Sequence, residues 1–239
     1  MTWSDLNVFQ YQQLEKILLG ENPLGHAMRI IAIINSTTES QVEKYSHKRL
    51  LKELQKIKFL ITQFDGKPKD YIQIGLKRYI CNYDINKVNT ARYIETKVFA
   101  KDFVQNLHKV AASMVMPTVL SPLGYFTKRY NATLHSIYSQ DIQEANFVDV
   151  YFSVTKYVKM ITDLDSNYKG LYDEIDQDME SQQQRGGSRF VEFYGWQYCA
   201  KIVAEHENIT LDAAYNLPVI QFLNDLSYLK AERDYIKNG

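Results

Sequence analysis

The chain reads FYGWQYCA at residues 193–200 and LPVIQFLNDLSYLK at residues 217–230, and these stretches indicate how its C-terminal part folds. Aromatic and aliphatic residues recur there at the spacing of one helical face, on both sides of Leu217–Pro218. The pattern predicts a helix over Phe190–His206 and a last helix that opens at Pro218, where a missing amide costs nothing. Neither stretch groups a nucleophile, a base or metal ligands. We therefore expect these helices to pack against other surfaces rather than to carry out chemistry.

Helical spacing also marks the N-terminal third, most clearly over His47–Ile61. Ser46 precedes this segment and is a favourable N-cap residue. The apolar positions expected to form its buried face are Leu50, Leu51, Leu54, Ile57, Leu60 and Ile61. Lysines occupy much of the other face, so the segment is predicted to be an amphipathic helix.

The pattern changes to a period of two after the turn residues of Asp65–Pro68. Tyr71–Ile74 and Arg78–Tyr83 are rich in aromatic and β-branched residues, which favour strands. Gly75–Lys77 between them has the length and the glycine of a short hairpin loop. The sequence therefore predicts one β-hairpin at about residues 70–83.

The middle of the chain is predicted to be helical again. A helix is expected over Asp102–Met116, because Pro117 disfavours helical geometry in the residue before it. The stretch 117–138 contains two prolines and several aromatic residues, and it is expected to be the longest irregular segment. A long helix is then expected to start at Ser139 or Asn146.

One polar, glycine-containing segment, residues 181–188, has no apolar anchor and is the best candidate for a linker. It would divide the chain into a mainly helical domain at 1–180, which contains the hairpin, and a C-terminal helical segment at 189–239. The predicted fold class is mainly α, a multi-helix bundle-like architecture with one small β-hairpin insertion at about 70–83 and a C-terminal helical subdomain.

Composition excludes several classes of partner. The chain has 28 lysine and arginine residues and 28 aspartate and glutamate residues, so no net field draws it onto nucleic acid or anionic membrane. No apolar run approaches the roughly 20 residues that span a bilayer, and the start lacks the pattern of a signal peptide. We expect a soluble, intracellular protein that does not bind membranes.

Catalytic and metal-binding patterns fail on inspection. Asp163–Glu174 places oxygen ligands as a calcium loop does, but Tyr168 stands where the sharp turn needs glycine. The two cysteines, Cys81 and Cys199, form neither a CxxC site nor a disulfide framework. The histidines, which lack metal-ligand spacing, are His26, His47, His108, His135 and His206. We expect no enzyme activity, no metal and no cofactor.

A nucleic-acid contact is the alternative that the charges leave open. Lys48, Lys52 and Lys56 form a basic stripe on the predicted helix at 47–61. Glu43, Glu53 and the balanced total favour a solvated face with ion pairs within the helix. The 18 tyrosines and 11 phenylalanines instead suit surfaces that become buried in an assembly, although AT-rich coding also raises the tyrosine content.

Several segments resemble proteins of tailed bacteriophages, among them crAss-like phages and relatives that infect Bacteroidetes. The shared order is an extended hairpin, a helix with a Thr-Ala-x-Tyr-Ile motif, and a helix that ends in proline. In this chain the corresponding segments are Trp3–Leu6, Phe9–Leu14, Asp70–Gly75, Lys77–Tyr79, Asp84–Ile94, Val115–Pro117, Gly195–Trp196, Leu217–Pro218 and Phe222–Leu229. They cover about two thirds of the chain and leave 117–188 without a counterpart.

The resemblance implies a non-enzymatic structural or tail-morphogenesis protein that acts through protein–protein contacts in virion or tail assembly. Its partners would be other phage tail or virion proteins, or further copies of itself in an oligomer. Its location would be the virion, the cytoplasm of the infected bacterial host, or both. The resemblance implies no catalytic residue, and it leaves open whether the protein stays in the particle or acts as an assembly chaperone.

The residues expected to contact a partner come from the C-terminal helices, which would offer them partly to their own core and partly to the partner. These candidate interface residues are Trp196, Tyr198, Phe222, Leu226 and Tyr228. The alternative function is a nucleic-acid-contacting virion protein near the portal or the packaged genome, which would use Lys48, Lys52 and Lys56.

Overall fold

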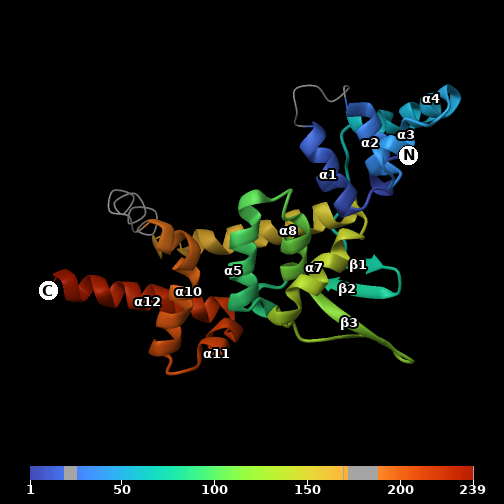
Figure 1. Cartoon of the computed structure of the whole chain (residues 1–239). Coiled ribbons are helices and arrows are strands. Elements are labelled where there is room, and N and C mark those ends of the chain that lie inside the picture. The colour runs from blue at the N-terminus through green and yellow to red at the C-terminus, as the bar shows by residue number, and fades with distance from the viewer. Residues whose placement is uncertain (19–25, 169, 172–187, 239) are drawn as a thin grey trace. The chain divides into compact units, whose positions relative to one another are not determined.

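The computed structural model describes residues 1–18, 26–168, 170–171 and 188–238 (Figure 1). The chain divides into two compact units that are each built from two chain segments. Unit 1 comprises Met1–Cys81 and Phe99–Lys156, and unit 2 comprises Asn82–Val98 and Tyr157–Gly239. The fold is mainly α with one small antiparallel sheet, which confirms the predicted class.

The helices of unit 1 are α1 (Val8–Leu18), α2 (Ala27–Ile34), α3 (Glu39–Val42), α4 (His47–Lys56), α6 (Leu107–Met114) and α7 (His135–Gln143). Its strands are β1 (Tyr71–Ile74), β2 (Lys77–Cys81), β3 (Val115–Ser121) and β4 (Gly124–Thr127). Unit 2 contains most of α5 (Thr90–Phe99) together with α10 (Ser188–His206), α11 (Leu211–Asn216) and α12 (Val219–Asn238). The boundary at Lys156 divides α8 (Phe147–Asp165) between the two units.

A cluster of aromatic rings joins the start of the chain to α8 within unit 1. The ring of Trp3 lies 5.2 to 6.2 Å from those of Tyr11, Phe64 and Phe147, measured between centroids. Tyr11 and Phe147 are stacked at 3.6 Å, and the Trp3 indole donates a hydrogen bond of 2.9 Å to the Thr62 carbonyl oxygen. Each buried ring removes a large apolar area from water, so this cluster is the main apolar anchor of the N-terminal segment.

The helix predicted over His47–Ile61 is real but shorter than expected. Helix α4 begins after the Ser46 cap, whose hydroxyl accepts a hydrogen bond from the Arg49 amide, and it ends at Lys56, after which Ile57–Ile61 continue as a 3₁₀ helix. The partly buried face, Leu50, Leu54 and Ile57, packs on a small core of Ile31, Ala32 and Val42. The tighter 3₁₀ turn ends the 3.6-residue period, and Leu51 and Ile61 are exposed, contrary to the prediction.

The predicted β-hairpin is present, with a two-residue loop. Strands β1 and β2 pair from Tyr71 opposite Ile80 to Ile74 opposite Lys77, so the loop is Gly75–Leu76 and Lys77 belongs to β2. Gly75 has φ 55°, the left-handed geometry that a two-residue hairpin requires at its first loop position and that only glycine adopts at no cost.

The hairpin is half of a four-stranded sheet of order β1-β2-β3-β4, and here the sequence interpretation was wrong. Helix α6 ends at Met114, and residues 115–121 and 124–127 form β3 and β4 rather than a helix end and an irregular loop. Pro117 does not end the helix. It lies in β3 opposite Tyr79, and its carbonyl accepts a hydrogen bond from the Lys128 amide beyond the end of β4. The nitrogen of Pro117 therefore faces the side of β3 beyond the end of β4, where the absence of a backbone hydrogen bond is tolerated.

The long helix predicted to start at Ser139 or Asn146 is α8, which begins directly after Asn146, whereas Ser139 lies in a separate helix, α7. Helix α7 begins at His135, inside the segment predicted to be irregular, and it lies beside the sheet in Figure 1. Asn146 caps α8, because its side-chain oxygen accepts a hydrogen bond of 3.0 Å from the Asp149 amide. Helix α7 ends at Gln143, with Glu144 as its C-cap residue, and the Asn146 cap then opens α8.

Unit 2 is held together around α5 and the last turns of α8. The Asp165 carboxylate binds the Lys97 ammonium at 2.6 Å and the Tyr93 hydroxyl at 2.5 Å. The segment between α11 and α12 pairs with the chain before α5, where the Thr90 amide donates to the Leu217 carbonyl at 2.9 Å and the Val219 amide donates to the Val88 carbonyl at 3.0 Å. The predicted break at Leu217–Pro218 is thus an extended junction, and α12 begins one residue later.

The predicted linker 181–188 lies outside the described residues except for Ser188, which begins α10. The boundary between a domain at 1–180 and a segment at 189–239 therefore stays a prediction.

Candidate protein-binding surfaces

The candidate interface residues of the C-terminal helices separate into buried and exposed members. Phe222 and Leu226 are buried in unit 2. Trp196 is half-buried, and its ring meets that of Tyr93 edge-on at 5.6 Å between centroids. These three side chains therefore contribute to the core of their own unit rather than to a free surface.

Tyr198 and Tyr228 are the exposed members of the set, at 50% and 55% of their full surface. The Tyr228 hydroxyl donates a hydrogen bond of 3.2 Å to Glu232, one turn further along α12, and its ring lies 5.4 Å from that of His206. The structure thus leaves two of the five predicted contact residues accessible to a partner.

The lysine stripe of α4 is also divided. Lys48 and Lys52 are exposed, whereas the Lys56 ammonium binds the carboxylate oxygens of Glu53 at 2.8 and 3.0 Å. The hydrogen bond from Lys56 lowers the pKa of Glu53, and Asn35 adds another at 3.1 Å. One of the three lysines is therefore already paired, as the ion-pair interpretation of this face predicts.

A larger accessible apolar surface lies at one end of the sheet, at a place for which sequence reasoning predicted only loops. We call it the sheet-end patch. Its members are Leu76, Val119, Leu120, Leu123 and Phe126, all of them exposed. The two turn residues protrude most, with Leu76 at 84% and Leu123 at 89% of their full surface.

The register of the strands produces this patch. Tyr79 of β2 lies opposite Pro117, so β3 continues past the first residue of β2 and carries its last residues beyond the rest of the sheet. Towards this end Val119 lies opposite Phe126, and in the extension itself Leu120 lies opposite Tyr125. The two hairpin turns lie at the same end of the sheet, where the Tyr125 hydroxyl reaches the Leu76 carbonyl at 3.4 Å. Figure 1 shows β3 extending away from α7.

The charges around the patch are basic. The Arg78 guanidinium lies 4.2 Å from the ring centroids of both Tyr71 and Tyr125, so it is held between two aromatic faces. Lys128 and Arg129 follow β4 and are exposed, and no acidic residue occurs from 115 to 130. The surface therefore has an apolar tip with cationic groups behind it.

A sequence signal for this hairpin existed. Ser121–Gly124 holds Pro and Gly between two short runs of β-branched and aromatic residues, which is a hairpin pattern. Pro117 conceals this signal, because a proline after a helical pattern predicts a helix stop followed by a loop.

One pair of side chains has the composition of a catalytic dyad but not its chemistry. The Ser113 hydroxyl lies 3.1 Å from His135 Nε2, and the same nitrogen lies 3.0 Å from the Lys109 carbonyl oxygen. A carbonyl can only accept, so Nε2 carries the proton and cannot act as the base for Ser113. Ser113 is also fully buried. The pair packs α6 against α7 and offers no activated nucleophile.

The two cysteines lack reactive environments as well. Burial raises the pKa of the Cys199 thiol to about 11, and Cys81 is buried. Among the described residues, no group of three His, Cys, Asp or Glu side chains is placed to hold a metal ion. Asp165 of the calcium-like segment binds Lys97 and Tyr93 instead, while 169 and 172–174 of that segment lie outside the described residues.

Within the part of the chain that the structure describes, no helix is both long and apolar enough to cross a membrane. Comparisons of this chain with family models, with curated proteins and with solved structures find no match.

Proposed function

We propose that this chain is a non-enzymatic structural or tail-morphogenesis protein of a tailed bacteriophage, and that it acts through protein–protein contacts in virion or tail assembly. The observation that carries the proposal is the sheet-end patch. The patch gathers five exposed apolar side chains on two adjacent hairpins. Val119 and Phe126 lie on one face of the β3–β4 hairpin and Leu120 on the other, so the projecting hairpin offers apolar side chains on both faces. Exposed apolar side chains gathered at one end of a sheet mark an interaction site more often than scattered single residues do.

The chemistry of the patch describes its partner. Leu123 and Phe126 would enter an apolar recess, and Lys128 and Arg129 would face acidic groups at its rim. Buried aromatic and aliphatic anchors dominate the binding energy of such interfaces, whereas charges at the rim mainly steer the approach. The partner is therefore a protein with an apolar pocket bordered by carboxylates.

The phage context of the proposal comes from the resemblance of the hairpin, the Thr90–Ile94 helix and the C-terminal segment to phage tail proteins. Tyr198 and Tyr228 are exposed on unit 2 and provide a second contact surface in this proposal. Two separate surfaces suit a protein that joins components of a particle.

Capture of phage structural proteins from infected cells tests the proposal. The tagged chain, the variant Leu123→Asp and the matched control Ile61→Asp would be expressed during infection and purified. Ile61 is a suitable control because it is 90% exposed, against 89% for Leu123, and lies outside the patch. Both substitutions place a charge on an exposed side chain, so both proteins should keep the wild-type circular dichroism spectrum.

We expect Leu123→Asp to reduce the captured amount of a phage virion or tail protein by about tenfold, since a charge in an apolar recess costs over 1 kcal/mol. Ile61→Asp should capture as much as the wild type. Equal capture by both variants, or capture of no phage structural protein by the wild type, would contradict the proposal.

A further inference from the structure

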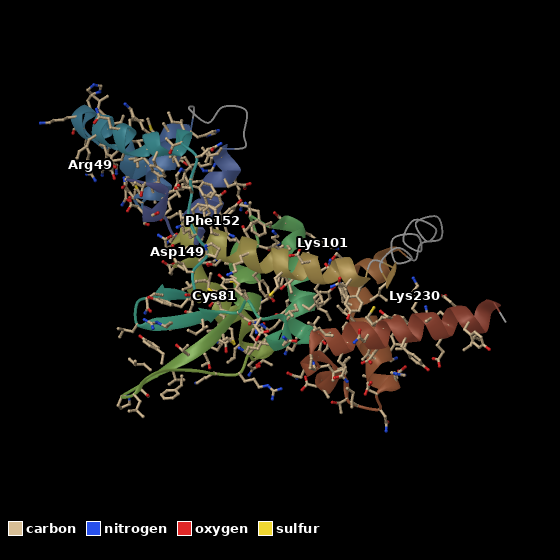
Figure 2. All side chains as sticks on the ribbon, turned by 180° about the vertical axis from the view of Figure 1, so that it is seen from behind. Arg49, Cys81, Lys101, Asp149, Phe152 and Lys230 are labelled. Carbon is tan, nitrogen blue, oxygen red and sulfur yellow. The ribbon has the colours of Figure 1, made fainter. Side chains whose placement is uncertain are left out.

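A groove lies at β1, which is an edge strand of the sheet in unit 1 among the described residues. The cavity has a volume of about 400 Å³ and is lined by the consecutive residues Pro68–Gln73 and by Asn146 and Asp149. Figure 2 labels Asp149 at the end of α8 that lies beside the β1–β2 hairpin. One wall of the groove is thus an edge strand, and the other is the beginning of a helix.

The hydrogen-bond pattern shows which backbone groups of β1 face the groove. The Cys81 amide donates to the Asp70 carbonyl at 2.9 Å, so residues 70 and 81 form a hydrogen-bonded pair. Such pairs alternate along an antiparallel ladder, so Ile72 and Ile74 also bond to β2 while Tyr71 and Gln73 turn their amides and carbonyls outward. The Thr118 hydroxyl bonds the Arg78 carbonyl at 2.6 Å, on the β3 side of β2, which fits this alternation.

The outward backbone groups of Tyr71 and Gln73 therefore lie along the groove with donors and acceptors at strand spacing. Such a row is the template on which a further strand adds. β1 has four residues and is about 13 Å long at ~3.3 Å per residue, which matches a partner segment of three to five residues.

The side chains of the groove add a charge preference. The Lys69 ammonium lies 3.4 Å from the Asp149 carboxylate, and the Lys69 amide donates to the Ser153 hydroxyl at 2.9 Å, which fixes this end of the groove to α8. Asp70 is exposed, and its carboxylate has no partner among the described residues. The groove therefore carries one unneutralised negative charge.

We propose that this groove binds an extended segment of a partner protein as a fifth strand of the sheet. The segment pairs with the outward backbone groups of Tyr71 and Gln73, and it places a lysine or arginine beside Asp70. The inference rests on the proposed protein-contact function and names a second kind of partner surface for it. Main-chain bonds supply the affinity in this mode of recognition, and the groove's side chains supply the selectivity.

The β4 edge also turns backbone groups outward, at Tyr125 and Thr127, but neither residue lines the groove. That edge provides the matched control for the experiment.

The test uses the purified full-length chain and a displayed library of random heptapeptides, followed by fluorescence polarisation with the peptide that is enriched most. We expect extended sequences with one lysine or arginine. Gln73→Pro removes the outward amide without breaking a ladder bond, so the sheet should persist while peptide affinity falls by about tenfold or more.

Three further variants separate the causes. Gln73→Ala loses the same side chain but keeps the amide, so it should lose clearly less peptide affinity than Gln73→Pro does. Thr127→Pro makes the equivalent change at the β4 edge and should also bind normally. Asp70→Asn should weaken the basic peptide by about threefold to tenfold and leave its lysine-to-glutamine version unchanged.

Hydrogen exchange on the wild type gives a reading that does not depend on any variant. The peptide should slow exchange of the Tyr71 and Gln73 amides and leave that of the Tyr125 and Thr127 amides unchanged. Enrichment of no peptide, binding that survives Gln73→Pro, or a dimer of this chain that Gln73→Pro disrupts would each overturn the proposal. These results do not depend on Leu123, so failure here is distinguishable from failure of the proposed function.

Discussion

Gly66 is packed too closely against α8 for any side chain to fit. A Cβ atom at this position would lie 2.7 Å from Phe152 Cδ2 and 2.7 Å from Val148 Cγ1. Phe152, labelled in Figure 2, and Val148 are an aromatic ring and a β-branched side chain, neither of which yields easily. The glycine therefore lets the chain before β1 lie directly on the helix.

Replacing this glycine should destabilise unit 1. We expect Gly66→Ala to lower the free energy of unfolding by about 1–3 kcal/mol, the usual cost of overpacking. Urea denaturation followed by circular dichroism measures the change. Gly170→Ala is the control, because its Cβ would meet nothing within 4 Å, and it should leave stability unchanged or slightly higher. Equal stability of the wild type and Gly66→Ala would show that the contact is not close.

His108 gives the fold a dependence on pH. Burial, followed by the nearby charges of Lys109 and His135, lowers the pKa of His108 from 6.5 to about 4. Its Nδ1 lies 2.9 Å from Gln12 Nε2, which can only donate, so the geometry also favours the neutral ring. The same Gln12 nitrogen lies 2.9 and 2.8 Å from the Val104 and Gln105 carbonyl oxygens, so its two hydrogens are shared among three acceptors, and it joins α1 to the chain before α6.

Stability should therefore fall as the pH is lowered through the window from about 6.5 to about 4, where the unfolded chain binds a proton at His108 and the folded chain does not. The expected loss between pH 7 and pH 4.5 is about 1–3 kcal/mol. In His108→Leu this pH-dependent loss of stability should be absent from the urea denaturation midpoints measured between pH 7 and pH 4.5. The exposed His47→Gln should retain it, and a wild-type profile in His108→Leu would contradict the assignment.

At the scale of side chains, the sequence predicted ion pairing and helical location correctly, but it did not predict which side chains are buried and which are exposed. The ion pairing of the lysine stripe on α4 agrees with the Lys56–Glu53 contact. The candidate interface residues, the aromatic Trp196, Tyr198, Phe222 and Tyr228 and the aliphatic Leu226, all lie on helices, as the sequence predicts. Periodicity locates the apolar face of a helix but not which part of that face another helix covers, so the separation into buried and exposed members required the structure.

At the scale of elements, the turn of the β3–β4 hairpin requires the backbone conformation of Gly124. This residue has φ 116°, a conformation that only glycine adopts readily. A Cβ there would meet nothing within 4 Å, so a substitution acts through backbone strain alone. The hairpin exposes Leu120 on one face and Phe126 on the other, which leaves few packed contacts to hold a strained turn in place.

We expect Gly124→Ala to strain the β3–β4 turn by about 1–3 kcal/mol while global stability changes little. Amide exchange should quicken at Val119, Leu120 and Phe126 and remain slow in α6. Gly124→Ala should also reduce the captured amount of the phage partner, because the hairpin that carries the sheet-end patch is less ordered. Thr127→Ala, which keeps the turn, is the control. Unchanged exchange in the hairpin of Gly124→Ala would show that the turn is not strained.

The elements themselves were predictable where one signal acted alone. The β1–β2 hairpin had both a period of two and a glycine in its loop, and it was found. The β3–β4 hairpin was missed because Pro117 carries two meanings, helix stop and strand margin, and only the pairing with Tyr79 and Lys128 selects between them. Likewise, Asn146 was recognised as a helix start, but the capping geometry was needed to show that α7 and α8 are separate.

On the scale of the whole molecule, the chain order does not follow the compact units. Unit 1 and unit 2 each combine two segments, and helix α8 contributes to both. Sequence patterns describe neighbours along the chain, whereas this division arises from contacts such as those of Leu217 and Val219 with the chain before α5. No local signal in the sequence could have predicted it.

The balanced charge of the whole molecule predicts that it does not bind double-stranded DNA. Lysine and arginine balance aspartate and glutamate at 28 each, and Lys56 of the basic stripe is paired with Glu53. We expect no salt-sensitive retention of double-stranded DNA by the purified chain, measured by electrophoretic shift from about 50 to 200 mM salt. Retention that disappears when Lys48, Lys52 and Lys56 are changed to alanine would instead favour the nucleic-acid alternative.

The most direct test of the central claim is quantitative mass spectrometry of purified particles and of tail-assembly intermediates from the producing phage. If the chain acts by protein contact in assembly, it should be present in particles at a whole-number ratio to a portal or tail component, or be absent from particles and bound to the intermediates. Leu123→Asp should deplete it from whichever fraction holds it. Expression in infected cells with the chain in neither fraction would contradict the account.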